Sequence, residues 1–179
     1  MYINWKRKQL IITVALYGPP RSGKTTTWRV LSQGAVAPPE ENADTFSLRL
    51  EEVQEKQVIL HVRDVPGEGA TPSERRIALY GVDGLVFVAD SGESRQEANR
   101  TSLVELDANL VSIKKSIHTV PFIFQYNKRD LEDALSVGDL QNQLNPDRLF
   151  PHQETIAIRS EGVLEVLRQA TDLVLTTAL

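Results

Sequence analysis

The pattern G-x-x-x-x-G-K-[ST] is met by Gly18-Pro19-Pro20-Arg21-Ser22-Gly23-Lys24-Thr25, and the residues on either side give this match structural meaning. Residues 10–17 form an apolar, β-branched run that predicts a strand, and residues 25–32 predict a helix. A glycine loop between a strand and a helix cradles phosphate, because backbone N–H groups and the positive helix end face the anion. A chance match in a turn is the alternative, and the flanking strand and helix argue against it.

Each position of this loop has an expected task. Lys24 should reach the β- and γ-phosphates, and the Thr25 hydroxyl should ligate Mg²⁺. The predicted nucleotide-binding residues of this segment are Gly18, Pro19, Pro20, Arg21, Ser22, Gly23, Lys24, Thr25 and Thr26.

The composition is ordinary for a globular protein and excludes several classes of function. The chain has 179 residues, 41% of them hydrophobic and 25% charged, so we expect one domain over residues 1–179 with a full hydrophobic core. A net charge of −4 argues against a broad basic surface for nucleic acid. The chain has no cysteine, which excludes disulfides, thiolate metal sites and thiol catalysis.

The beginning of the chain does not resemble a signal peptide. Lys6, Arg7 and Lys8 precede a short apolar run that ends in the glycine loop, and no apolar stretch approaches the length of a membrane span. We therefore expect a cytoplasmic protein. The basic cluster itself suits a solvated strand edge better than contact with acidic lipid or a partner.

Strand and helix signals alternate along the chain. The predicted strands cover residues 10–17, 45–53, 56–65, 84–90, 120–125 and 154–158, and the predicted helices cover residues 25–32, 74–80, 93–117, 136–144 and 162–175. Strands 45–53 and 56–65 should form a hairpin. The continuous apolar strands imply an α/β fold with a largely parallel six-stranded sheet and helices on both faces. Ligands of such sheets bind at the carboxyl ends of the strands.

Two motifs follow predicted strands at that edge. Asp64-Val65-Pro66-Gly67 fits D-x-x-G, in which the carboxylate holds Mg²⁺ through a water and the glycine N–H senses a γ-phosphate. Asn127-Lys128-Arg129-Asp130 fits N-K-x-D. The Asp130 carboxylate can accept two hydrogen bonds from guanine, and adenine offers no such pair of donors on that edge. The Lys128 stem can pack along the base, and Asn127 can tie the segment to the phosphate loop; a charged turn is the alternative.

Two weaker candidates complete the expected site. The backbone N–H of Ala157 suits the guanine carbonyl oxygen, since it follows the last predicted strand. Thr45, after the acidic loop 34–44, suits a second hydroxyl ligand of Mg²⁺ that engages with GTP; otherwise it is simply the first residue of a strand. The metal ligands expected from the sequence are therefore Thr25, Thr45 and Asp64.

The three motifs in this order resemble those of Ras-superfamily small GTPases. The likeness to the bacterial MglA-like (mutual gliding-motility) GTPases covers nearly the whole chain and is carried by residues 3–5, 17–19, 75–76, 81–84, 86–91, 127–131 and 161–163. It implies a P-loop NTPase with a Ras-like G domain that binds GTP or GDP with Mg²⁺, hydrolyses GTP and acts as a molecular switch. It also implies a homodimeric roadblock-type activating partner and effectors that read the loops 34–45 and 67–73. Arg75 and Arg76 are candidates for contact with such a partner or with the acidic first loop, and a solvated helix face is the alternative.

The chain departs from the family pattern where GTP is hydrolysed. Glu68 stands where these GTPases usually carry the glutamine that orients the attacking water. Asp44 stands where MglA places an arginine finger, and loss of such a finger costs on the order of 10³–10⁵ in rate. Asp64, in contrast, replaces the threonine usual in MglA and follows Ras-like proteins more generally.

Two more departures concern binding of the nucleotide. Pro20 occupies a loop position that is normally glycine, which removes one N–H donor and stiffens the loop. Arg21 beside it can replace some positive charge or point outward into solvent. No aromatic residue from Ser32 to Thr45 is available to cover the second face of the base, so we expect a lower affinity for GTP.

Three functions follow from these observations. The first is a slow GTP hydrolase in cell polarity or motility, with catalytic candidates Lys24, Glu68 and Thr45. The second is a hydrolysis-deficient module that binds GTP or GDP and presents its loops to partners. The third, a P-loop nucleoside or nucleotide kinase, is disfavoured because the guanine motif indicates a held ligand and no second phosphate-acceptor site is visible.

Overall fold

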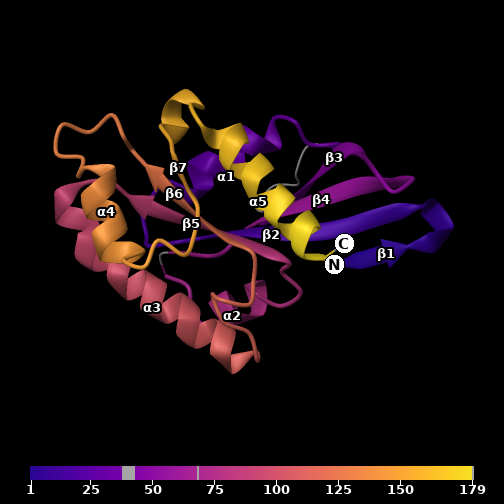
Figure 1. Ribbon diagram of the computed structural model, residues 1–179, viewed down its shortest axis with the longest axis horizontal. Coiled ribbons are helices and arrows are strands. Elements are labelled where there is room, and N and C mark those ends of the chain that lie inside the picture. Colours follow the sequence, from indigo (N-terminus) through magenta and orange to yellow (C-terminus); the bar gives the residue numbers. More distant parts are fainter. Residues whose placement is uncertain (38–42, 68, 179) are drawn as a thin grey trace.

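The computed structural model describes residues 1–37, 43–67 and 69–178, and these residues form a seven-stranded sheet between two layers of helices (Figure 1). The strands follow the order β3-β4-β2-β5-β6-β7, with β1 paired to β2. Their bounds are β1 Tyr2–Asn4, β2 Gln9–Tyr17, β3 Thr45–Val53, β4 Lys56–Asp64, β5 Gly84–Asp90, β6 Phe122–Asn127 and β7 His152–Glu154.

The helices divide between the two faces of the sheet. Helices α1 (Lys24–Ser32) and α5 (Val163–Ala178) cover one face, whereas α2 (Pro72–Ala78), α3 (Gln96–Ser112) and α4 (Val137–Leu144) cover the other (Figure 1). Short 3₁₀ turns cover Trp5–Arg7, Glu93–Arg95 and Ala157–Arg159. Each face has its own hydrophobic core, because the parallel strands of the sheet centre are apolar on both sides. The predicted α/β architecture of a Ras-like G domain is confirmed.

The register of the parallel strands brings the motifs together. In β2, Leu16 lies beside Asp64 at the end of β4, and Tyr17 lies beside Phe87 in β5. At the other side of β5, Asp90 pairs with Asn127 at the end of β6. The strand ends that carry the phosphate loop, D-x-x-G and N-K-x-D therefore meet at one edge of the sheet. The hairpin of β3 and β4 is antiparallel as predicted.

The structure corrects the number and bounds of several elements. The additional strand is β1, which pairs antiparallel with Gln9–Ile11 at the beginning of β2. The last strand, predicted at residues 154–158, is shorter and earlier, at His152–Glu154. After Glu154 the backbone turns toward Asn127, whose side chain binds Thr155 and Ala157, so it leaves the sheet.

The helix predicted at residues 93–117 is also shorter than expected. A 3₁₀ turn occupies Glu93–Arg95, and α3 ends at Ser112. Lys114 follows in a left-handed conformation with φ of 60°, which a continuing α-helix does not allow. Among the described residues, none of the helices combines the length and apolar character needed to cross a membrane.

Candidate nucleotide-binding site

The phosphate loop has a backbone that requires glycine at two positions. Gly18 has φ of 147° and Gly23 has φ of 103°, both unfavourable for a residue with a Cβ. A Cβ at Gly18 would collide with the carbonyl oxygen of Val88, and a Cβ at Gly23 would collide with the Asn127 amide. The loop therefore packs directly against the ends of β5 and β6, which is why both glycines are needed.

Lys24 begins α1 and points back over the loop. Its Nζ donates to the carbonyl oxygens of Gly18 and Pro19, both at 2.9 Å, and the residue is 6% exposed. Burial lowers the pKa of Lys24 to about 8, partly opposed by the charge of Asp64 and assisted by that of Arg75. A buried cation at a helix N-terminus suits the binding of phosphate.

Thr25 and Asp64 form the pair expected at a Mg²⁺ site. The Thr25 hydroxyl donates to Asp64 Oδ2 at 2.9 Å. The other carboxylate oxygen, Oδ1, is buried and has no hydrogen-bond partner among the described residues. Burial raises the pKa of Asp64, and the Thr25 hydrogen bond and the Lys24 charge oppose this effect. Hydroxyl and carboxylate oxygens are ligands that Mg²⁺ prefers, so these residues fit the metal together with phosphate oxygens.

Thr45 does not join this pair in the structure. It lies directly opposite Arg63 of β4, so these two side chains share one face of the sheet, while the neighbouring Asp64 points to the other face. The Thr45 hydroxyl donates to Asp44 Oδ1 at 2.8 Å and accepts from Arg63 Nε at 3.4 Å. Engagement of Mg²⁺ by Thr45 would require its side chain to leave Arg63 and turn toward Asp64.

Gly67 lies beside the lysine of the phosphate loop, since a Cβ built on it would be 3.1 Å from Lys24 Nζ. Arg75 of α2 donates from Nη2 to the Gly67 carbonyl oxygen at 2.8 Å and from Nη1 to Glu105 Oε2 at 2.6 Å. The residue after Gly67, Glu68, lies outside the described residues. Arg75 thus connects the D-x-x-G loop to α3 within the protein itself.

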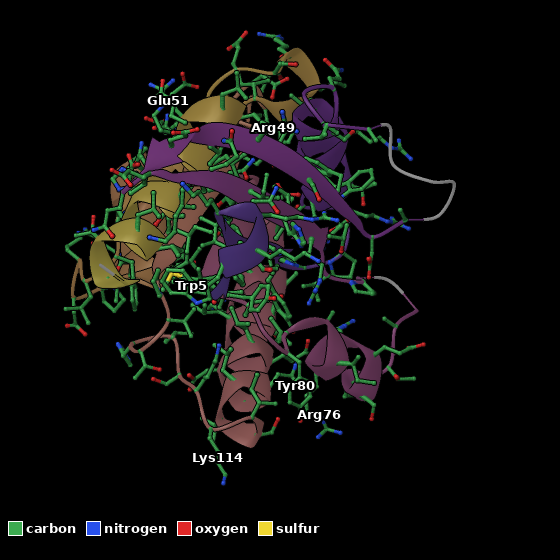
Figure 2. The ribbon with its side chains drawn as sticks, turned by 90° about the vertical axis from the view of Figure 1, so that its right-hand side faces the viewer. Trp5, Arg49, Glu51, Arg76, Tyr80 and Lys114 are labelled. Carbon is green, nitrogen blue, oxygen red and sulfur yellow. The ribbon has the colours of Figure 1, made fainter. Side chains whose placement is uncertain are left out.

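The other end of α2 is also held by an arginine. Arg63 Nη1 donates to the carbonyl oxygens of Ala78 at 2.9 Å and Tyr80 at 3.1 Å. Figure 2 shows Arg76 and Tyr80 on the outer side of this segment, and Tyr80 is 57% exposed. Of the two neighbouring arginines, Arg75 is therefore used internally, and half-buried Arg76 lies on the outer side of the segment, where its Nη2 donates to Ser73 Oγ at 3.5 Å.

Asn127 joins three segments of the site. Its Nδ2 donates to the Ser22 carbonyl oxygen at 2.8 Å, which is the link to the phosphate loop that the motif predicts. Its Oδ1 accepts from the Thr155 hydroxyl and from the Ala157 N–H, both at 3.0 Å. The Ala157 N–H, expected to face a guanine carbonyl, is thus directed at Asn127 in this structure.

Lys128 and Asp130 differ in their surroundings. Lys128 Nζ donates to Asp90 Oδ2 at 2.8 Å. The Asp130 side chain is 26% exposed, and its Oδ2 lies 3.9 Å from Arg159 Nη2. Asp130 can therefore be reached from solvent, as a carboxylate that recognises a base must be.

Several residues that support the site were not expected from the sequence. Gln125, fully buried in β6, donates to the hydroxyls of Thr27 at 2.8 Å and Thr155 at 3.0 Å. Asp90 binds Lys128, although the sequence indicates only the end of a strand at this position. The sequence signal for Gln125 is a polar residue within an apolar strand, and the signal for Asp90 is a polar residue at the carboxyl end of one. Thr26, expected at the phosphates, is half-buried beside Thr27 in α1.

Comparison with known proteins agrees with this geometry. A model of the ADP-ribosylation factor family matches residues 2–175 of the chain. The mutual gliding-motility protein MglA of Myxococcus xanthus (strain DK1622) is 32% identical over 188 aligned residues, which cover 98% of this chain and 96% of MglA. Both results support the resemblance inferred from the motifs. The chain therefore belongs to the ADP-ribosylation factor family of Ras-superfamily small GTPases, which bind guanine nucleotides and hydrolyse GTP.

Proposed function

We propose that this protein is a molecular switch that binds GTP or GDP with Mg²⁺ and hydrolyses GTP slowly. The main support is the meeting of Lys24, the Thr25–Asp64 pair and Asn127 at one edge of the sheet. Lys24 would bind the β- and γ-phosphates, Thr25 and Asp64 would hold Mg²⁺, and Asp130 would recognise guanine. Bound Mg²⁺ would supply positive charge to the transferring phosphoryl group.

Slow hydrolysis is expected because two acidic residues stand at sequence positions where related GTPases carry groups that assist hydrolysis. Glu68 replaces a glutamine that orients water, and Asp44 replaces an arginine finger of MglA. The Asp44 carboxylate is also close enough to Asp64 to raise the pKa of that group. Negative charge beside the γ-phosphate would oppose the negative charge that develops on the phosphoryl oxygens in the transition state. An activating partner would therefore have to supply or order the groups that stabilise this charge and orient water.

The relationship to MglA supports a proposal about the partners. We propose that residues 1–179 act as one G domain in the cytoplasm, in polarity or motility-type regulation. The loops 34–45 and 67–73 would bind effectors and a roadblock-type activating protein. Exposed Tyr80 and half-buried Arg76, which follow the second loop, lie on the outer side of this segment, where such a partner would bind (Figure 2).

A second candidate is a binding module without useful turnover. It is favoured by the position of Thr45, whose hydroxyl is held by Asp44 and Arg63 on the face opposite Asp64. If that arrangement persists with GTP bound, Thr45 cannot complete the metal site, and hydrolysis would be lost while binding remained.

The first experiment is to identify the co-purified nucleotide and then to measure Mg²⁺-dependent turnover of GTP, with ATP as the control substrate. Slow GTP turnover supports the switch, whereas bound guanine nucleotide without turnover supports the module. Glu68→Gln should raise the intrinsic rate, and an unchanged rate would show that Glu68 is not the defect. Asp130→Asn should weaken the preference for GTP over ATP; a preserved preference would contradict the assigned guanine recognition.

A further inference from the structure

We propose that Asp90 and Arg95 form a bridge that ties the phosphate loop to Lys128 and holds this lysine in place for the base. Neither Asp90 nor Arg95 belongs to the nucleotide-binding motifs. Both act as positioning residues: Asp90 reaches the nucleotide through Lys128, and Arg95 reaches it through the phosphate loop. The inference rests on the proposed function, because it concerns how the same site is held ready for guanine nucleotide.

The Asp90 carboxylate lies at the centre of the bridge. It ends β5, between the strands that carry the phosphate loop and N-K-x-D (Figure 1), and it is 1% exposed. Its Oδ2 accepts from Lys128 Nζ at 2.8 Å and lies 3.5 Å from Arg95 Nε, while its Oδ1 accepts from the Gly92 N–H at 3.0 Å. A buried carboxylate is costly unless it is paired and hydrogen-bonded, and both requirements are met here.

Two buried amide side chains of α3 hold the backbone of Asp90. Asn99 accepts from the Asp90 N–H at 3.0 Å and donates to the Asp90 carbonyl oxygen at 2.8 Å. Gln96 donates to the carbonyl oxygens of Asp90 at 3.2 Å and Gly92 at 2.8 Å. Because these amides are satisfied by this one turn, the position of the carboxylate is defined by the fold and not by Lys128 alone.

Arg95 extends the bridge to the phosphate loop. Its Nη2 donates to the Pro20 carbonyl oxygen at 2.7 Å. Proline has no N–H, so the carbonyl oxygen is the only hydrogen-bonding group of Pro20. The contacts therefore run from Pro20 through Arg95 and Asp90 to Lys128, and they connect the loop that binds phosphate with the segment that binds the base.

The consequence for binding is preorganisation. The stem of Lys128 is expected to pack along the guanine base, and a long flexible side chain loses entropy when it is fixed there. Asp90 already holds the ammonium group of Lys128, so much of this entropy is lost before the nucleotide binds. The entropic cost of binding is therefore lower, the complex is more stable, and the nucleotide is released more slowly. Removal of the Asp90 charge should therefore accelerate release without altering the groups that touch the nucleotide.

The test is the release rate of a fluorescent GDP analogue (mant-GDP) from the Mg²⁺-loaded full chain and from four variants. Asp90→Asn should release the nucleotide about tenfold faster, since the ion pair with Lys128 becomes a weaker hydrogen bond from the ammonium group to an uncharged amide oxygen. The double variant with Lys128→Met should release it no faster than Lys128→Met alone, because Asp90 acts through Lys128. Arg100→Ala, on the exposed side of α3 in an ion pair with Glu97, is the matched control and should behave as wild type.

The outcomes separate the bridge from a general loss of structure. Two results would overturn the bridge. One is a double variant whose release rate rises by the product of the two single effects of Asp90→Asn and Lys128→Met, and the other is an unchanged release rate in Asp90→Asn. If Asp90→Asn does not fold, Arg95→Ala gives the same test from a residue whose side chain is 34% exposed, with faster release expected and unchanged release against the proposal. A wild-type chain that binds no mant-GDP would contradict the proposed function, and the bridge with it.

Discussion

At the level of single residues, the buried ammonium of Lys24 makes nucleotide binding depend on pH. Burial lowers its pKa to about 8, so above that pH the free protein loses the charge that phosphate requires. The affinity for GDP should therefore fall about tenfold between about pH 7 and pH 9, as the protonated fraction of a group with this pKa does. Titration of mant-GDP at both pH values checks this, and binding at pH 9 should take up a proton.

A rise in pH that deprotonates Lys24 weakens nucleotide binding but stabilises the nucleotide-free protein. The folded pKa of Lys24 lies below the ordinary value of 10.5, so between about pH 8 and pH 10.5 the unfolded state binds more protons. The contribution of Lys24 to the free energy of unfolding should thus rise with pH over this range. Chemical denaturation at several pH values measures this, and an equal pH dependence of the free energy of unfolding in a Lys24→Met variant, which lacks the group, would contradict the assignment.

A side chain added at Gly67 would require Lys24 to move. A Cβ there would lie 3.1 Å from Lys24 Nζ, so Gly67→Ala should displace the lysine and weaken binding of mant-GTP about tenfold or more. Gly138→Ala, in α4, is the control, because its Cβ would make only ordinary contact with the Ser136 hydroxyl at 3.6 Å. Equal affinities of the two variants would show that Gly67 does not approach the phosphate site.

At the level of the elements, the hairpin of β3 and β4 has a strained turn. Gln54 and Glu55 connect the strands with φ of 49° and 60°, a conformation that favours Asn-Gly. The double substitution Gln54→Asn and Glu55→Gly should raise the free energy of unfolding by about 1 kcal/mol, or the Tm by about 3 °C. Thermal unfolding measures this, and Glu51→Gly within β3 should instead lower the Tm.

At the level of the whole molecule, nucleotide should stabilise the fold because the site joins α1, β4, β5 and β6. Saturation with GDP and Mg²⁺ at about 100 times the Kd adds about 2.7 kcal/mol, which corresponds to a rise in Tm of about 8 °C. Lys24→Ala should abolish most of this rise. A similar rise in Lys24→Ala, or an equal rise with ADP, would contradict binding of guanine nucleotide at this site.

The architecture and the location of the site were largely predictable because local patterns carry them. Apolar runs alternating with helical periodicity predict a parallel sheet, and such a sheet gathers its strand ends at one edge. Gly18, Asp64 and Asn127 stand at or directly after those ends, and Gly23 and Thr25 lie in the loop and helix that follow β2, so their meeting followed from position. The additional strand β1 and the early turn after β7 could not be predicted, since short segments gain their order from neighbouring strands.

The order of motifs along the chain was therefore sufficient for the family, the phosphate loop and the guanine motif. The contacts of Thr45 and Asp90 emerged only on folding. Thr45 is directed to Arg63 because antiparallel pairing sets which face each β3 side chain occupies, and a shift of one residue would reverse it. Asp90 meets Lys128 because β5 pairs with β6, whereas its contact with Arg95 is formed within the 3₁₀ turn that follows β5. Contacts between residues distant in sequence depend on register and packing, which no local pattern encodes.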